Sequence, residues 1–290
     1  MTKLATLLLI RLFTGDPEDV HIFSDVPYVN GGGYKNQLDL YLPGSTSFPT
    51  IVFVHGGSLR SGDRKGFPII EPYREIGTQF ARLGMGMVVL SYRLGPDNKW
   101  PTMAQDVAAA VAWTKRRITG YGGDSMKIYL AGHSSGGHVA SVVATNEMFL
   151  KEAGGTLRDV AGCIVLSSSL HPSFDIEGMD GEELKRVWAT AHQQGGYESV
   201  FLTPGAYRDA DPCYHVNSQA PDFLVIFGDD EAQRTPALEH ADRFTGLLHD
   251  AGVRSQVEIV ENRTHMSLLR NMAEEGDPTV MLIKRFVTKR

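Results

Sequence analysis

Residues 128–138 read Ile-Tyr-Leu-Ala-Gly-His-Ser-Ser-Gly-Gly-His, and this stretch decides the fold. Its apolar start predicts a buried strand, and the small residues at 137–145 predict a helix directly after it. Gly132, Ser134 and Gly136 form a Gly-x-Ser-x-Gly pattern between the two. A serine on a tight strand-to-helix turn is typical of a nucleophile elbow, because flanking glycines leave room for the strained backbone. We therefore predict Ser134 as a nucleophile.

The same alternation of strand and helix runs along most of the chain. The apolar run at residues 50–55 is typical of a strand buried on both faces, whereas residues 37–42 alternate as an exposed edge strand does. Further strands are predicted at residues 86–92, 127–131, 162–167, 221–227 and 256–260, and helices at residues 73–83, 103–118, 137–145, 182–192, 237–251 and 280–289. This alternation predicts an α/β fold with a mostly parallel central sheet and helices on both faces.

Residues from about 170 to 220 interrupt this rhythm. They contain no clear strand, one predicted helix and six scattered aromatic residues, namely Phe174, Trp188, Tyr197, Phe201, Tyr207 and Tyr214. An excursion of this length inside a compact domain usually has a function. We expect a single domain over residues 1–290 in which this segment is a cap insertion over the active site. A surface excursion without a role in the site is the alternative.

A serine hydroxyl becomes a good nucleophile only when a base takes its proton. Where the serine stands on such an elbow, the chain order is serine, acid and then histidine. His265 directly follows the last predicted strand, which brings it to the same sheet edge as the elbow, so we predict it as the base. His240 and His249 fall on a predicted helix and are expected at the surface. His133 and His138 belong to the elbow and its helix, where packing or orienting roles are expected.

The acid is expected after the strand at residues 221–227, where the chain reads Gly-Asp-Asp-Glu. The usual frame places the carboxylate three residues after the glycine, which favours Glu231. A glutamate can orient an imidazole and stabilise the imidazolium as an aspartate does. Asp230 and Asp229 stay open as alternative acids, with turn or helix-cap roles as the other explanation for them.

A glycine-rich loop is predicted after the strand at residues 50–55. It begins His55-Gly56-Gly57, and unhindered backbone N–H groups in such a loop can bind a developing oxyanion. The backbone N–H of Ser135 is a further donor at the elbow. Gly56, Gly57 and Ser135 are therefore the predicted oxyanion hole.

Composition narrows the classes of protein that fit. The 290 residues carry a net charge of −6 and no dense Lys/Arg cluster, which argues against a nucleic-acid partner. The ten histidines show no metal-ligand spacing, so neither a metal nor an organic cofactor is predicted. Two cysteines make no disulfide framework, and the apolar run at residues 4–10 is too short to span a bilayer and lacks a cleavage site. We predict a cytoplasmic protein without stable membrane insertion; the sequence allows a homodimer.

From about residue 38 to the C-terminus the sequence resembles the esterase/arylformamidase branch of the α/β-hydrolase superfamily, near the hormone-sensitive-lipase-like carboxylesterases. The shared motifs are Leu-Asp-Leu-Tyr-Leu-Pro at 38–43, His-Gly-Gly at 55–57, Ser-Tyr-Arg-Leu at 91–94, Tyr-Gly-Gly-Asp at 121–124, the elbow at 132–138, and Thr-His at 264–265. The resemblance implies a triad of Ser134, Glu231 and His265. Two features depart from the pattern: Leu59 stands where kynurenine formamidases carry Trp, and the acid is Glu where Asp is commoner.

The sequence therefore predicts a serine hydrolase that cleaves a carboxylic ester through an acyl-enzyme. Its substrate is expected to be a small to medium apolar or aromatic molecule, because aromatic residues are frequent in the predicted cap. An arylformamidase is the first alternative, and a biosynthetic thioesterase or lactone-forming or lactone-opening hydrolase is the second. A non-catalytic, hydrolase-like ligand receptor is a third, although candidates for all triad members are present.

Overall fold

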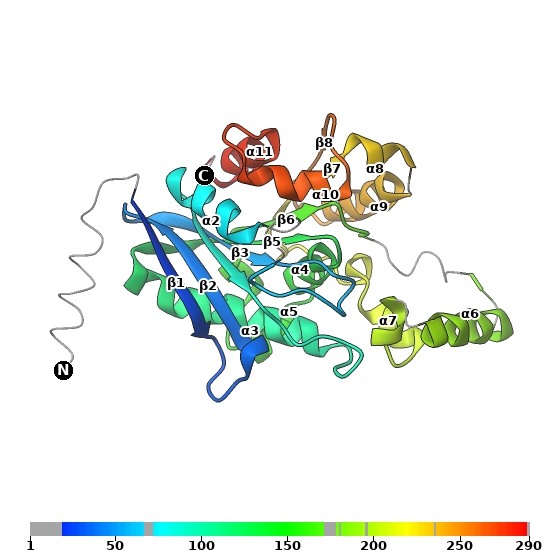
Figure 1. Ribbon diagram of the computed structural model, residues 1–290. Helices are drawn as coiled ribbons and strands as arrows, with labels where there is room; N and C mark the ends of the chain where they lie inside the picture. Colours follow the sequence, from blue (N-terminus) through cyan, green and yellow to red (C-terminus); the bar gives the residue numbers. More distant parts are fainter. Residues whose placement is uncertain are drawn as a thin grey trace.

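The computed structural model describes residues 19–66, 72–170, 178–179, 181–194, 197–234 and 236–288 (Figure 1). The apolar run at residues 4–10 lies outside them. Eight strands form one sheet: β1 (Val20–Pro27), β2 (Gln37–Pro43), β3 (Phe48–Val54), β4 (Gly86–Leu90), β5 (Gly123–His133), β6 (Gly162–Leu166), β7 (Asp222–Gly228) and β8 (Ser255–Val260).

The strands lie side by side in the order β1-β2-β4-β3-β5-β6-β7-β8. β1 and β2 pair antiparallel, as do β2 and β4, and all other neighbours are parallel. The mostly parallel sheet predicted from the sequence is therefore observed. Because parallel strands end at the same sheet edge, the loops after β3, β5, β6, β7 and β8 all meet there.

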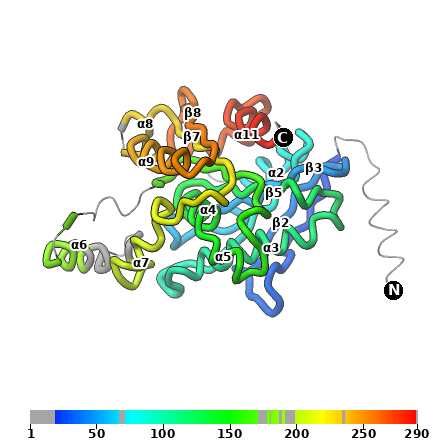
Figure 2. Tube along the Cα trace, turned by 180° about the vertical axis from the view of Figure 1, so that it is seen from behind, coloured from blue at the N-terminus to red at the C-terminus, as the bar shows by residue number. Residues whose placement is uncertain are grey.

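Helices cover both faces of the sheet. The helices of the described residues are α2 (Tyr73–Arg82), α3 (Thr102–Arg117), α4 (Ser135–Thr145), α5 (Glu147–Glu152), α6 (Gly181–Gln194), α7 (Pro204–Asp209), α8 (Asp229–Arg234), α9 (Ala237–Asp250), α10 (His265–Arg270) and α11 (Pro278–Thr288). One apolar core contains buried residues of α3, α4, α5 and α9, and the other contains residues of α2, α10 and α11. Figure 2 shows α3, α4 and α5 together on one side, away from α11.

Alternation along β7 shows how one strand supplies both cores. Phe223 and Val225 pack in the core with α9, whereas Leu224 and Ile226 pack in the core with α10 and α11. A strand buried on both faces therefore appears in the sequence as a continuous apolar run. No helix in the described part of the chain is long and apolar enough to cross a membrane.

The prediction of an exposed edge strand at residues 37–42 is wrong in one respect. β2 is a strand, but it lies between β1 and β4, and Asp39 on it is buried. Its carboxylate bonds the guanidinium of Arg64 and the ammonium of Lys65, so the polar residue marks a buried ion pair and not a solvent-facing position. The edge strand on this side of the sheet is β1, which the sequence pattern did not reveal.

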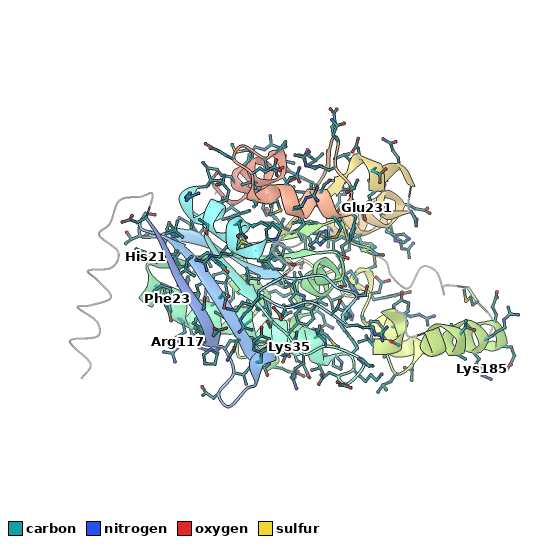
Figure 3. The ribbon with its side chains drawn as sticks, viewed as in Figure 1. His21, Phe23, Lys35, Arg117, Lys185 and Glu231 are labelled. Atoms are coloured by element: carbon teal, nitrogen blue, oxygen red, sulfur yellow. The ribbon has the colours of Figure 1, made fainter. Side chains whose placement is uncertain are left out.

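The predicted cap insertion is described only in part. Residues 171–177, 180 and 195–196 lie outside the described ranges. α6 extends away from the sheet, and Lys185 on it lies far from Glu231 (Figures 1 and 3). The segment's C-terminal part, by contrast, is attached to the domain. Phe201 packs on Trp100 with ring centroids 5.7 Å apart.

Candidate active site

Ser134 stands on a strained turn between β5 and α4. Its φ of 55° and ψ of −132° are unusual for a residue with a side chain. A Cβ at Gly132 would lie 2.3 Å from the carbonyl oxygen of Gly136, and one at Gly136 would lie 2.3 Å from that of Val54. Both glycines are therefore required by close backbone contacts. The strand-to-helix elbow has the geometry that the pattern predicts.

His265 begins α10, at the same edge of the sheet. Its Nδ1 donates a hydrogen bond to Oε1 of Glu231, with the two atoms 3.1 Å apart. This bond leaves Nε2 as the ring nitrogen that can accept a proton. Thr264 caps α10 by accepting a bond from the Ser267 N–H, so the imidazole stands at the start of a closed helical turn.

Glu231 is the member of the three candidate carboxylates that the structure brings to His265. It lies in α8 beside α10 (Figure 3). Burial raises the pKa of Glu231, but its contacts with His265 and Ser167 lower it by more, so that the pKa lies below its ordinary value. A carboxylate of this kind is ionised at neutral pH and stabilises a neighbouring imidazolium.

The two aspartates before Glu231 contact the histidine loop in another way. Oδ1 of Asp229 accepts a hydrogen bond from the backbone N–H of Arg263 at 3.0 Å, and backbone amides of this loop lower the pKa of Asp229. The N–H of Asp230 donates to the carbonyl of Arg263 at 3.3 Å. A Cβ at Gly228 would come within 2.3 Å of that same carbonyl oxygen. This turn therefore fastens the loop that carries His265.

His133, the residue before the nucleophile, is buried beside the predicted base. Its Nε2 donates to the backbone carbonyl of His265 at 2.8 Å, and the two rings lie 4.7 Å apart. Burial, with a smaller effect of His265, lowers the pKa of His133 to about 4. His133 is therefore neutral at pH 7 and ties the elbow to the histidine loop, which agrees with the orienting role expected for it.

The predicted oxyanion loop lies directly against the elbow. A Cβ at Gly56 would stand 3.1 Å from Cβ of Ser134, and Gly57 has a φ of +107°, which favours glycine. Nδ1 of His55 donates to the carbonyl of Gly56 at 2.7 Å and so orients that peptide. Oγ of Ser135 accepts a bond from the N–H of Leu59 at 3.3 Å. The structure thus brings Gly56, Gly57 and Ser135 to the elbow.

A pocket of about 240 Å³ opens over these residues. Every side chain that lines it in the described part of the chain is polar: Ser58, Ser134, Ser135, His138, Ser167, Ser168, Ser169, Glu231 and His265. The nucleophile, base and acid candidates therefore share one cavity. None of the described cap residues lines it.

Comparison with known proteins places these features in a family. The sequence model of the BD-FAE family matches residues 38–237, which include the elbow, the oxyanion loop and Glu231. The chain belongs to the BD-FAE family. It is 28% identical over 239 residues to the esterase LipQ of Mycobacterium tuberculosis, covering 79% of this chain and 53% of LipQ. It is 26% identical over 253 residues to an isoprenylcysteine α-carbonyl methylesterase of Arabidopsis thaliana, covering 83% of this chain and 56% of that protein.

This BD-FAE family chain thus spans about half the length of the curated relatives that it matches. Among solved structures, an esterase of Pyrobaculum calidifontis superposes with a TM-score of 0.68 at 22% identity, covering 98% of this chain and 89% of that one. The likeness confirms the predicted α/β-hydrolase fold. The comparisons do not single out the arylformamidase branch.

Two features of this BD-FAE family chain escaped the sequence patterns. Arg64 is fully buried, and its guanidinium bonds Asp39, Asp25 and Gln37, which fastens the oxyanion loop to β1 and β2. A lone Asp within the apolar run at residues 38–42 was the available signal, because a buried carboxylate requires a cation. His240, expected at the surface, is buried on α9, whereas His249 is exposed as expected.

Proposed function

We propose that this chain is a carboxylic ester hydrolase that works by acyl transfer through Ser134, His265 and Glu231. The observation that carries the proposal is the 3.1 Å bond between His265 Nδ1 and Glu231 Oε1 in the pocket that also holds the strained Ser134. Relatives named as esterases support the reaction class.

In the first step Ser134 Oγ attacks the ester carbonyl carbon while Nε2 of His265 takes the hydroxyl proton. The carbonyl oxygen becomes an oxyanion, which the backbone N–H groups of Gly56, Gly57 and Ser135 stabilise. The tetrahedral intermediate then collapses, the bond to the alkoxy oxygen breaks, and His265 gives its proton to the leaving alcohol. Glu231 stabilises the imidazolium in between.

In the second step a water molecule replaces the alcohol. Its proton passes to His265, its oxygen bonds the acyl carbon, and the Ser134 ester bond breaks to release a carboxylic acid. Because each donor and acceptor is used twice, one arrangement of groups serves both halves of the reaction.

The pocket bears on the kind of ester. An apolar or aromatic substrate was expected from six aromatic residues of the cap. Of these, Phe201 and Tyr207 pack into the core and Tyr214 is exposed. The side chains of the other three, Phe174, Trp188 and Tyr197, lie outside the described part of the chain. None of Phe201, Tyr207 and Tyr214 lines the pocket, whose lining in the described ranges consists of serine, histidine and glutamate side chains. Because the pocket is small, with a volume of about 240 Å³, we propose esters with a short acyl group as the preferred substrates.

We further propose that residues from about 170 to 220 form a cap over the active site. This proposal is supported by the attachment of the segment's C-terminal part to the site, since Nε2 of His138 donates to the carbonyl of Ala210. His138 stands on the helix that follows Ser134 and also stacks on Trp100. A shift of this segment would therefore displace His138 and the start of the helix that follows Ser134.

A fluorophosphonate probe and p-nitrophenyl acetate test the proposal together. Wild-type protein should form a covalent adduct at Ser134 and release p-nitrophenol, whereas Ser134→Ala should lose both signals. The exposed Ser218 provides a matched control, because Ser218→Ala removes a hydroxyl far along the chain from the elbow. Ester turnover retained by Ser134→Ala would refute the mechanism. Faster turnover of N-formylkynurenine than of acetate esters would favour an arylformamidase instead.

A further inference from the structure

Ser169 is a pocket hydroxyl that the proposed mechanism does not use. It follows β6, two residues after Ser167, and its side chain faces the pocket that holds Ser134. The proposed reaction occupies Ser134, Ser135, Glu231 and His265, whereas Ser169 is left as an exposed hydroxyl within the same cavity.

A buried histidine holds this hydroxyl. Oγ of Ser169 lies 3.1 Å from Nδ1 of His240, which stands on α9 and is 5% exposed. In one tautomer Nδ1 accepts from the serine O–H, which leaves the Oγ lone pairs free to accept from a ligand. In the other tautomer Nδ1 donates to Oγ, and the serine O–H points toward the ligand. In both tautomers Ser169 and His240 present one oriented hydroxyl, which can accept a hydrogen bond from a ligand or donate one to it.

The position of Ser169 indicates which part of an ester it meets. The oxyanion loop follows β3, on one side of the elbow strand β5, whereas β6, β7 and β8 lie on the other side. The carbonyl oxygen must face the oxyanion loop, and the leaving oxygen must face His265, which follows β8. The alcohol portion of the ester therefore lies on the side where Ser169 stands.

We infer that Ser169, oriented by His240, binds a hydroxyl group of the ester's alcohol portion and so determines specificity for esters whose alcohol carries a free hydroxyl. The inference rests on the proposed ester hydrolysis at Ser134. A neutral hydrogen bond that is made in the transition state is worth about threefold to tenfold in kcat/KM.

Glycerol monoacetate and propyl acetate separate this role from the chemistry, because they share the acyl group and the number of carbons in the alcohol. Ser169→Ala should lower kcat/KM for glycerol monoacetate about threefold to tenfold and change that for propyl acetate by less than about twofold. Ser169→Thr keeps a hydroxyl and should retain most of the preference. His240→Asn should weaken the preference in the same direction as Ser169→Ala.

Ser58 supplies the matched control, since it is a pocket serine on the oxyanion side of the elbow. Ser58→Ala should leave the ratio of the two kcat/KM values within about twofold of wild type. An unchanged ratio in Ser169→Ala, an equal loss for both esters, or turnover of p-nitrophenyl acetate without turnover of glycerol monoacetate would overturn the inference alone. Absence of all ester turnover, with Ser134 left unmodified by the fluorophosphonate probe, would overturn the proposed function itself.

Discussion

Replacement of Glu231 by Gln tests the assignment of Glu231 as the acid of the triad. The change keeps the shape of the side chain but removes the charge that faces His265 Nδ1 at 3.1 Å. At that separation the attraction between a carboxylate and an imidazolium is about 5 kcal/mol at an effective dielectric constant near 20, and about 1 kcal/mol in bulk water. The Glu231 side chain is 15% exposed and that of His265 is 39% exposed, so the pair lies between these limits.

An intermediate value of about 3 kcal/mol corresponds to a loss of about 10²-fold in kcat. KM should change by less than about threefold, because Glu231 orients the base and does not hold the substrate. Steady-state hydrolysis of p-nitrophenyl acetate above pH 7 measures both constants. Asp230→Asn is the matched control, since it removes one carboxylate from the same turn, and it should cost less than about threefold.

The opposite pattern would refute the assignment. If Glu231→Gln kept nearly full activity while Asp230→Asn or Asp229→Asn lost about 10²-fold, another carboxylate would be the acid. A loss confined to KM would instead show that Glu231 contacts the substrate.

Three further predictions concern how the site is supported, and urea denaturation followed by circular dichroism measures each of them. Burial, and to a smaller degree the neighbouring His265, lowers the pKa of His133 from 6.5 to about 4. Because the unfolded chain binds that proton more readily, His133 should contribute a fall of up to about 3 kcal/mol in the unfolding free energy as pH drops from 6.5 toward 4. Burial also lowers the pKa of His55 to about 4, so His133→Asn should remove only the share of the decline that His133 contributes. Gly136→Ala should lower the unfolding free energy by about 3 kcal/mol, because the new Cβ would clash with the end of β3. Gly246 lies on α9 with open space around it, so Gly246→Ala should raise the unfolding free energy by about 0.5 kcal/mol. A change of the same sign in both variants would contradict the packing argument. Arg64→Met should cost about 3 kcal/mol, because the buried carboxylate of Asp39 loses one of its cations. Arg254→Met breaks an exposed ion pair and should cost less than about 1 kcal/mol. Equal losses would rule out the buried network as a source of stability.

Much of the fold could be read from apolar periodicity. The helix predicted at residues 73–83 is observed as Tyr73–Arg82, and the strand predicted at residues 162–167 as Gly162–Leu166. Periodicity failed at β1 and β2. β1 mixes polar and apolar residues because its side chains are exposed or half-buried, and the polar Asp39 on β2 is paired inside the protein. A sequence pattern shows which residues are polar, but it does not show the partner that allows a polar residue to be buried.

The candidate site was predictable where chain order decides it and open where tertiary contacts decide it. Ser134 and His265 follow strands, so their meeting at one sheet edge follows from the parallel sheet. The choice of acid does not, because Asp229 and Glu231 are two residues apart at the start of α8 and point in different directions. Asp229 bonds the backbone before His265, and Glu231 bonds the imidazole. The contact between Ser169 and His240 joins residues 71 positions apart, which no local pattern reveals.

The position of the imidazole is set by several elements at once. The N–H of Arg263 bonds Asp229 at the start of α8, and its guanidinium bonds the fully buried carboxylate of Asp277 at the start of α11. The carbonyl of His265 accepts a bond from His133 at the end of β5. Because these contacts hold the backbone without Glu231, the acid contributes charge and ring orientation more than anchoring. Removal of the Glu231 charge should therefore lower kcat while the folded structure and its affinity for substrate persist.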